Sequence, residues 1–180
     1  MSKIGRRPIE LTSAKVEIKK EGEIEIKGPK ASFTHKLPEE IEASLKDGKL
    51  IVSLKKMTKK SNELWGLHRA LLANKVKGVE TGFEKKVKIV GLGYKAQLSG
   101  KKLIFSLGYS HKIDFELPEN VAVDVDKTGQ NLIFKSSDKL ALGNVCDSIR
   151  SLRPPEPYKG TGIILEGERI IRKAGKAKTA

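Results

Sequence analysis

The chain has 180 residues, 32% of them charged and 38% hydrophobic, so it can form one large or two small domains with modest cores. Its 36 Lys and Arg residues exceed its 22 Asp and Glu residues by 14, which indicates a polyanionic partner, nucleic acid first and an acidic membrane surface second. The sequence shows no bilayer-spanning run and no signal peptide, and its single Cys146 permits no intrachain disulfide, so we expect a cytoplasmic protein.

The first half of the chain predicts two hairpins followed by a helix. After a basic lead-in over residues 1–10, alternating apolar and polar residues predict hairpins over 16–26 and 41–54. The apolar spacing then becomes helical. We expect a helix that Ser61 caps at its start and Gly78 ends.

The second half repeats this order of elements. Alternating residues predict strands between residues 86 and 134, and the helix that follows has Ser137 as its expected cap and ends at Arg153, before two prolines. A shift of eighty residues brings similar residues into register, which predicts an internal duplication. The matched positions are Ile24 and Ile104, Gly28 and Gly108, Leu37-Pro38-Glu39 and Leu117-Pro118-Glu119, and Ile41 and Val121.

These patterns predict an α+β fold with two duplicated domains. Each domain is expected to be a small antiparallel β-sheet packed against one α-helix. We place the N-terminal domain at residues 1–81, the C-terminal domain at 82–168 and a basic tail at 169–180.

Residues 91–96, GLGYKA, resemble a dinucleotide-binding fingerprint but are followed by a strand pattern. The fingerprint needs a helix there to hold the pyrophosphate, so we read Gly91 and Gly93 as a bulge or a tight strand crossing. An enzyme that binds a nucleotide at this turn remains a weaker alternative. The three histidines are isolated in the sequence, Cys146 has the position of a packing residue, and we find no catalytic carboxylate pair. We therefore expect no enzyme, no metal, no cofactor and no small-molecule substrate.

The most informative stretch is LRPPEPYKGTGI, residues 152–163. Its prolines are expected to hold the chain extended, close to polyproline II. Lys159, Gly160, Thr161 and Gly162 supply a cation, a hydroxyl and permissive glycines, a combination that suits contact with phosphate. The ring of Tyr158 could either pack on the first domain or stack on a base or sugar.

The tail that follows has cations and no acid beyond Glu168. Its cations are Arg169, Arg172, Lys173, Lys176 and Lys178. Such a segment is typical of an arm that lies on phosphates, and the alternative is a frayed, solvated end.

Four stretches give the chain a resemblance to a known family. RPPEPYKGTGI, the opening SKIGRRPI, the segment NKVKGVETGF and GLGYKA resemble the bacterial large-subunit ribosomal protein L6 family over essentially the whole chain. The resemblance implies two duplicated α+β domains and a structural role in the ribosome. It also implies binding to large-subunit ribosomal RNA, mainly through the C-terminal domain and tail, near the sarcin-ricin loop and the base of the factor-binding stalk. The expected partners are that RNA and neighbouring ribosomal proteins, with no membrane.

The resemblance and the charge of the tail together select the residues expected to contact RNA. They are Arg153, Tyr158, Lys159, Gly160, Thr161, Gly162, Arg169, Arg172, Lys173, Lys176 and Lys178. Members of the family usually have lysine at Thr161 and an arginine-tyrosine pair at Ile164-Leu165. The apolar pair here predicts that residues 163–165 pack as a short strand and moves the expected contacts toward Lys159 and the tail. A basic protein-interaction or membrane-surface module is the alternative function.

Overall fold

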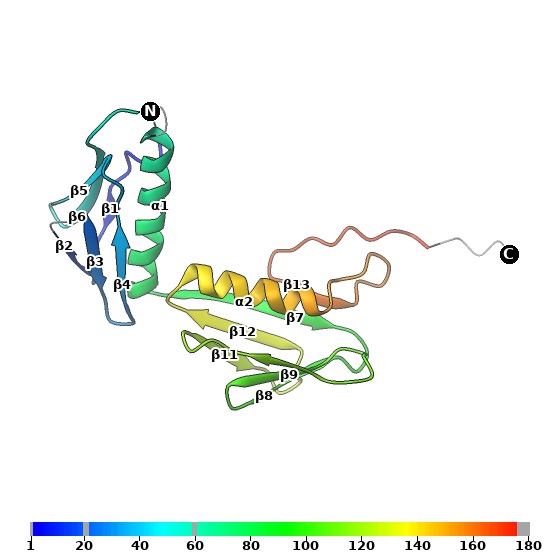
Figure 1. The fold of residues 1–180 in the computed structure, drawn as a ribbon. Helices are drawn as coiled ribbons and strands as arrows, with labels where there is room; N and C mark the ends of the chain where they lie inside the picture. Colours follow the sequence, from blue (N-terminus) through cyan, green and yellow to red (C-terminus); the bar gives the residue numbers. More distant parts are fainter. Residues whose placement is uncertain (1, 20–21, 59–60, 176–180) are drawn as a thin grey trace. The chain divides into compact units, whose positions relative to one another are not determined.

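The computed structural model describes residues 2–19, 22–58 and 61–175. By their internal contacts the residues form two compact units, Met1–Phe83 with Ser137–Lys139, and Glu84–Ser136 with Leu140–Ala180. The elements along the chain are β1 (Ile9–Glu10), β2 (Lys15–Ile18), β3 (Glu23–Lys27), β4 (Ser32–Lys36), β5 (Ile41–Lys46), β6 (Lys49–Leu54), α1 (Ser61–Glu80), β7 (Phe83–Val90), β8 (Lys95–Ser99), β9 (Lys102–Ser106), β10 (Ile113–Glu116), β11 (Val121–Val125), β12 (Asn131–Ser136), α2 (Lys139–Leu152) and β13 (Gly162–Leu165) (Figure 1).

The first unit packs α1 against antiparallel strands of two sheets. In the described residues the strand orders are β2-β3-β4 and β1-β6-β5. The sequence suggested only a basic lead-in over residues 1–10. The structure places strand β1 at the end of this stretch, with Ile9 opposite Leu50 of β6. The helix is joined to the same sheet by Trp65, whose Nε1 donates to the carbonyl oxygen of Val52 at 2.7 Å.

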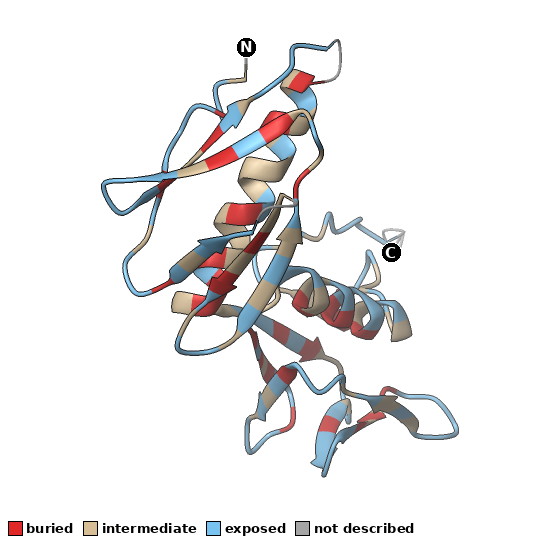
Figure 2. Cartoon of the chain, turned by 60° about the vertical axis from the view of Figure 1, so that its left-hand side comes forward, coloured by how far each residue is buried: buried red, intermediate tan, exposed pale blue. Residues whose placement is uncertain are grey.

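The second unit has a three-stranded sheet and a four-stranded sheet, again with one helix. Among the described residues the orders are β10-β9-β8 and β11-β12-β7-β13. Buried residues recur every second position along the strands and gather on one side of α2, as Figure 2 shows. Cys146 is fully buried on that side of α2, as predicted, and burial raises the pKa of its thiol. No described helix has the length and apolar character needed to cross a membrane.

Equivalent turns confirm the duplication. In each half a Leu-Pro-Glu turn bonds to the residue that precedes the neighbouring strand. The Leu37 N–H donates to the carbonyl oxygen of Gly22, before β3, at 2.9 Å, and the Leu117 N–H donates to the carbonyl oxygen of Lys101, before β9, at 3.0 Å. Each half nevertheless contains two sheets where the sequence pattern suggested one. The α+β fold with one helix in each half is confirmed.

The shift between the halves is not constant along the chain. Strand β3 begins at Glu23 and its counterpart β9 begins at Lys102, so Ile24 corresponds to Leu103. The predicted match of Ile24 with Ile104 is wrong by one residue, because Ile104 points to the other face of the sheet and is partly exposed. Loops of different length between the strands account for the difference.

The predicted helix ends need correction. Gly78 does not end α1 but lies inside it, and the helix ends at Glu80 before Gly82, whose φ is 80°. The hydroxyl of Ser61 bonds back to the main chain of Thr58 instead of capping the helix. The second helix begins at Lys139, later than a cap at Ser137 predicts.

Two histidines that are isolated in the sequence meet in the first unit. His35 Nε2 lies 2.9 Å from His68 Nδ1, and Lys75 Nζ lies 3.3 Å from His35 Nδ1. Burial, followed by the nearby charges of Lys75 and His68, lowers the pKa of His35 to about 4. His35 is therefore neutral at physiological pH. Within the described residues no three metal-ligating side chains form a group.

This lowered pKa predicts that the first unit loses stability as the pH falls from 6.5 toward 4. In that window the unfolded chain, with an ordinary histidine pKa of 6.5, binds a proton that the folded His35 does not. We expect the free energy of unfolding to fall less between about pH 7 and about pH 5 in His35→Gln than in the wild type. Trp65 is the only tryptophan of the chain, so its fluorescence during urea denaturation reports on this unit.

The matched control is His111→Gln, because His111 is an exposed histidine of the second unit. This control is expected to keep the wild-type pH dependence of the Trp65 signal. Equal pH dependence in His35→Gln and the wild type would contradict the assignment.

Candidate nucleic-acid interface

The strand β13 positions the C-terminal stretch that the sequence singled out. It pairs antiparallel with β7, with Gly162 opposite Val90 and Leu165 opposite Val87. Ile163 is fully buried, so the predicted short strand over residues 163–165 is confirmed. Because β13 starts beside the end of β7, the loop before β13 lies next to the loop that follows β7.

The loop of residues 153–161, called the proline loop below, is closed on itself. The Glu156 N–H donates to the Thr161 carbonyl oxygen at 3.0 Å, and the Thr161 hydroxyl donates to the Glu156 carboxylate at 2.8 Å. Residues 157–159 form a turn. The expected extended segment is therefore interrupted at Pro157, and the hydroxyl of Thr161 is used within the loop.

The two glycines of the proline loop and its strand are required by packing. A Cβ on Gly162 would lie 2.7 Å from the Pro154 carbonyl oxygen, and Gly162 is buried. Gly160 has a φ of 72°, and a Cβ there would lie 2.9 Å from Nη2 of Arg172. The lack of a side chain at Gly162 thus lets the strand approach Pro154 closely, and the lack of one at Gly160 leaves room for the Arg172 guanidinium.

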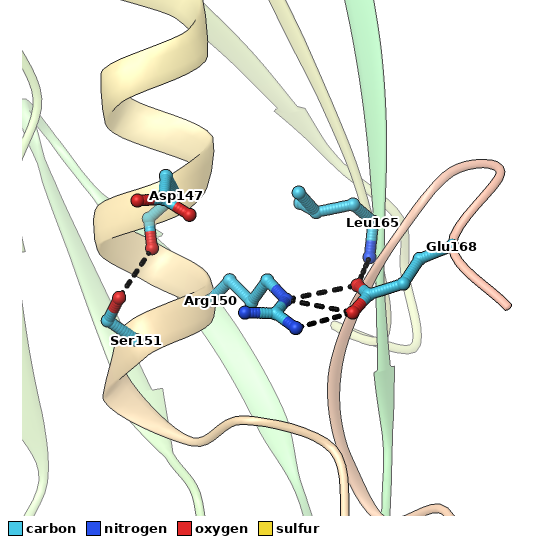
Figure 3. A network of polar contacts seen from close by, with 5 residues as sticks. All are labelled: Asp147, Arg150, Ser151, Leu165 and Glu168. Carbon is cyan, nitrogen blue, oxygen red and sulfur yellow. Dashed lines mark hydrogen bonds and ion pairs between the residues drawn. The ribbon is translucent and has the colours of Figure 1, made fainter. Parts of the chain in front are cut away.

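An ion pair fixes the point where the tail leaves β13. The guanidinium of Arg150 on α2 contacts both carboxylate oxygens of Glu168, with distances of 2.5 to 3.0 Å, and the Leu165 N–H donates to the same carboxylate at 3.2 Å (Figure 3). These contacts, chiefly the hydrogen bonds from Arg150, lower the pKa of Glu168. The carboxylate therefore stays ionised and joins the end of the strand to the helix.

The tail then returns to the proline loop. The Lys173 N–H donates to the Pro157 carbonyl oxygen at 2.8 Å, and Arg172 packs over Gly160. Residues 169–173 are therefore held against the loop in part by main-chain contact, not extended away from it as an arm. Lys176 and Lys178, which the sequence also predicted as contacts, lie outside the described residues.

Cations gather where the loop and the tail meet. Lys159, Arg169, Arg172 and Lys173 are exposed, and Arg153 is partly exposed. In the described part of the chain none of these five side chains forms an ion pair, whereas the neighbouring Glu166 and Glu168 each pair with a cation. Tyr158 lies among them with 59% of its surface exposed. The loop and the tail thus carry exposed cations without ion-pair partners among the described residues, together with an exposed ring.

Sequence reasoning missed two tyrosines and a histidine beside Arg153. The Arg153 guanidinium lies 4.8 Å from the centre of the Tyr109 ring, and Tyr109 donates its hydroxyl to the Leu152 carbonyl oxygen at 3.1 Å. Hydrogen bonding to Tyr109, then charge interaction with Tyr94, raises the pKa of Arg153. His111 stacks on Tyr109 at 6.2 Å between ring centres. The run GYSHK between two strands, which combines rings and a cation in a loop, was the available signal.

GLGYKA forms a turn between β7 and β8, which confirms that no helix follows it. The Tyr94 N–H donates to the Gly91 carbonyl oxygen at 3.3 Å. The connection is therefore a tight turn between two strands, without the helix N-terminus that a dinucleotide site needs.

Comparison with known proteins identifies the family. The description Ribosomal protein L6 applies to the family whose sequence profile matches residues 12–82 and 90–165. The chain belongs to the ribosomal protein L6 family. The L6 match ends with β13, so the turn at Glu168 and the tail lie beyond it.

Full-length relatives agree with this assignment. The chain is 44% identical to the large ribosomal subunit protein uL6 of Myxococcus xanthus, over 99% of this chain and 100% of the relative. It is 46% identical to the protein of the same name in Syntrophomonas wolfei, over 98% of both chains. The L6 family consists of structural ribosomal proteins, and this member is not an enzyme.

The geometry predicts that Glu168→Gln loosens the tail. The substitution removes the anion that faces Arg150 but keeps the volume of the side chain. We expect the amide of Lys173, which bonds to the proline loop, to exchange with solvent about tenfold faster. Hydrogen exchange measured by NMR or mass spectrometry checks this.

Glu166→Gln is the matched control. Its carboxylate lies 3.7 Å from Lys86 and is 59% exposed, compared with 23% for Glu168. Exposed pairs of this kind contribute little, so the control is expected to exchange like the wild type. Equal exchange rates in the two variants would show that the Arg150 pair does not hold the tail.

Proposed function

We propose that the chain is a structural component of the large ribosomal subunit and binds large-subunit ribosomal RNA through its proline loop and tail. Support for the first part comes from relatives that carry the name large ribosomal subunit protein uL6 and align over nearly their whole length. The second part rests on one observation, the five cations where the loop and the tail meet, which have no ion-pair partner among the residues that the structure describes.

Phosphate neutralisation supplies most of the binding free energy in this proposal. Lysine and arginine side chains that approach RNA phosphates release condensed counterions, and the affinity then falls steeply with salt. The cations available to neutralise phosphates are Arg169, Arg172 and Lys173 in the described part of the tail and Lys159 in the proline loop. Because main-chain hydrogen bonds hold both segments in place, part of the conformational entropy cost of binding is already met during folding.

The difference between the two halves supports placing RNA binding in the second unit. After α1 the chain passes through Thr81-Gly82 directly into β7, whereas after α2 it builds the proline loop, β13 and the tail. The loop and the tail are thus additions to the second copy. We infer that the first unit faces neighbouring ribosomal proteins or solvent.

The proposed location is near the sarcin-ricin loop and the base of the factor-binding stalk, as the family resemblance implies. There the protein would support the region where translational GTPases dock. Lysine, arginine and main-chain contacts position a protein on RNA without reading its bases, so specificity would come from the shape of an RNA junction.

Removing the exposed charges of the loop and the tail tests the proposal. A variant with Lys159, Arg169, Arg172 and Lys173 all changed to Ala is expected to bind in vitro transcribed large-subunit ribosomal RNA at least tenfold more weakly. The slope of log affinity against log salt should become shallower by about 0.7 to 0.9 for each phosphate that the variant no longer neutralises. Filter binding over a series of salt concentrations measures both quantities. Deleting residues 169–180 should act in the same direction.

The matched control removes four positive charges from the first unit, at Lys36, Lys46, Lys55 and Lys56. All four are exposed, so the net charge changes equally while the loop and the tail stay intact. We expect a much smaller loss of affinity and of salt dependence. Equal effects of the two variants would indicate binding through net charge alone and would refute the assigned surface.

A further inference from the structure

A cluster of aromatic and cationic side chains lies beside the proline loop. It consists of Tyr94, Tyr109, His111 and Arg153, and is called the Tyr109 cluster below. The Arg153 guanidinium covers the Tyr109 ring at 4.8 Å, and the rings of Tyr109 and His111 are 6.2 Å apart with 25° between their planes. The guanidinium plane and the two rings are thus gathered in one place, from loops far apart in the sequence.

The surrounding main chain holds these planes. A Cβ on Gly91 would lie 2.5 Å from the Tyr94 ring, and one on Gly108 would lie 2.8 Å from it, so both glycines make room for the ring. The hydroxyl of Tyr109 is bonded to the end of α2. The Arg153 carbonyl oxygen accepts from the Ile163 N–H at 2.8 Å, which joins the cluster to β13. A ligand would therefore meet a largely preorganised surface.

Tyr109 and His111 of the cluster are open to solvent, and Tyr94 and Arg153 are partly exposed. Tyr109 is 42% exposed, His111 is exposed, and Leu92 is fully exposed at the tip of the turn that holds Tyr94. A cluster whose purpose was packing alone would bury its rings, because burial of apolar ring surface is what stabilises a fold. Lys112 follows His111 and is also exposed.

Tyrosine, histidine and arginine planes are the side chains on which unpaired bases stack in RNA complexes. A base inside a helix is stacked on its own neighbours and has no free face. A phosphate would be met by charge alone and would not need aligned rings. The chemistry that fits the Tyr109 cluster is thus a nucleotide from a loop, bulge or helix end.

We propose that the Tyr109 cluster binds one unpaired nucleotide of ribosomal RNA by stacking, beside the surface that neutralises phosphates. The proposal rests on the proposed RNA-binding function and adds a contact that depends on RNA secondary structure. The proline loop and the tail position the protein on the backbone, and the cluster fixes one base against it.

Substitutions at Tyr109 separate stacking from charge. Tyr109→Leu is expected to weaken binding to in vitro transcribed large-subunit ribosomal RNA about 5- to 100-fold with an unchanged salt slope, because every cation that faces a phosphate is kept. Tyr109→Phe keeps the ring and removes only the hydroxyl with its hydrogen bonds to Leu152 and Arg153, so it should keep most of the affinity that Tyr109→Leu loses. His111→Ala changes an exposed side chain and should weaken binding even if Tyr109→Leu perturbs folding.

Chemical probing of the RNA locates the nucleotide. The wild-type protein is expected to alter the reactivity of at least one unpaired base toward dimethyl sulfate, and Tyr109→Leu should abolish that change while backbone protection from hydroxyl radicals remains.

Retained affinity in both Tyr109→Leu and His111→Ala would overturn the proposal. An equal loss of affinity in Tyr109→Phe would overturn it as well, because it would show that Tyr109 acts through its hydrogen bond to the end of α2. Retained affinity would instead fit a cluster that contacts a protein neighbour. A wild-type protein that binds the RNA no better than the charge-removed variant refutes the proposed function itself, whatever the Tyr109 variants do.

Discussion

The short antiparallel pairing of β13 with β7 is the constraint on which the rest of the candidate site depends. It brings the chain back beside the start of the second unit after α2 and places the proline loop against the turn that follows β7. Ile163 is buried as the strand docks, so the hydrophobic effect and the ladder hydrogen bonds act together. Once β13 is seated, the loop before it and the turn after it have little freedom.

The charged side chains of this region fall into two groups, those that have a partner of opposite charge and those that do not. Glu168 is paired with Arg150 in a partly buried contact, and Glu166 lies near Lys86 at the surface, so each acid of the turn has a cation beside it. The cations of the proline loop and the tail have no such partners in the described residues. The same turn therefore serves stability and, in the proposed function, leaves an excess of positive charge for a polyanion.

The two halves show how one copy of a duplicated unit can acquire additional segments, here those of the proposed binding surface. The Leu-Pro-Glu turns have kept equivalent hydrogen bonds, while the loops between the strands differ in length. The second half adds β13 at the edge of the sheet formed by β11, β12 and β7. That addition covers a sheet edge and at the same time carries the loop and the tail.

The sequence by itself determined the α+β class, the duplication, the excess of positive charge, the helix stop at the prolines and the strand over 163–165. These are local properties, set by the period of apolar residues, by proline geometry and by charge. Only the tertiary structure decided that Lys173 returns to Pro157, that Glu168 belongs to Arg150, and that Tyr94, Tyr109 and Arg153 meet. These contacts join residues from different loops, and several use main-chain groups or glycine positions that look the same in any sequence. The resulting surface depends on the register of β13 on β7, which no local pattern encodes.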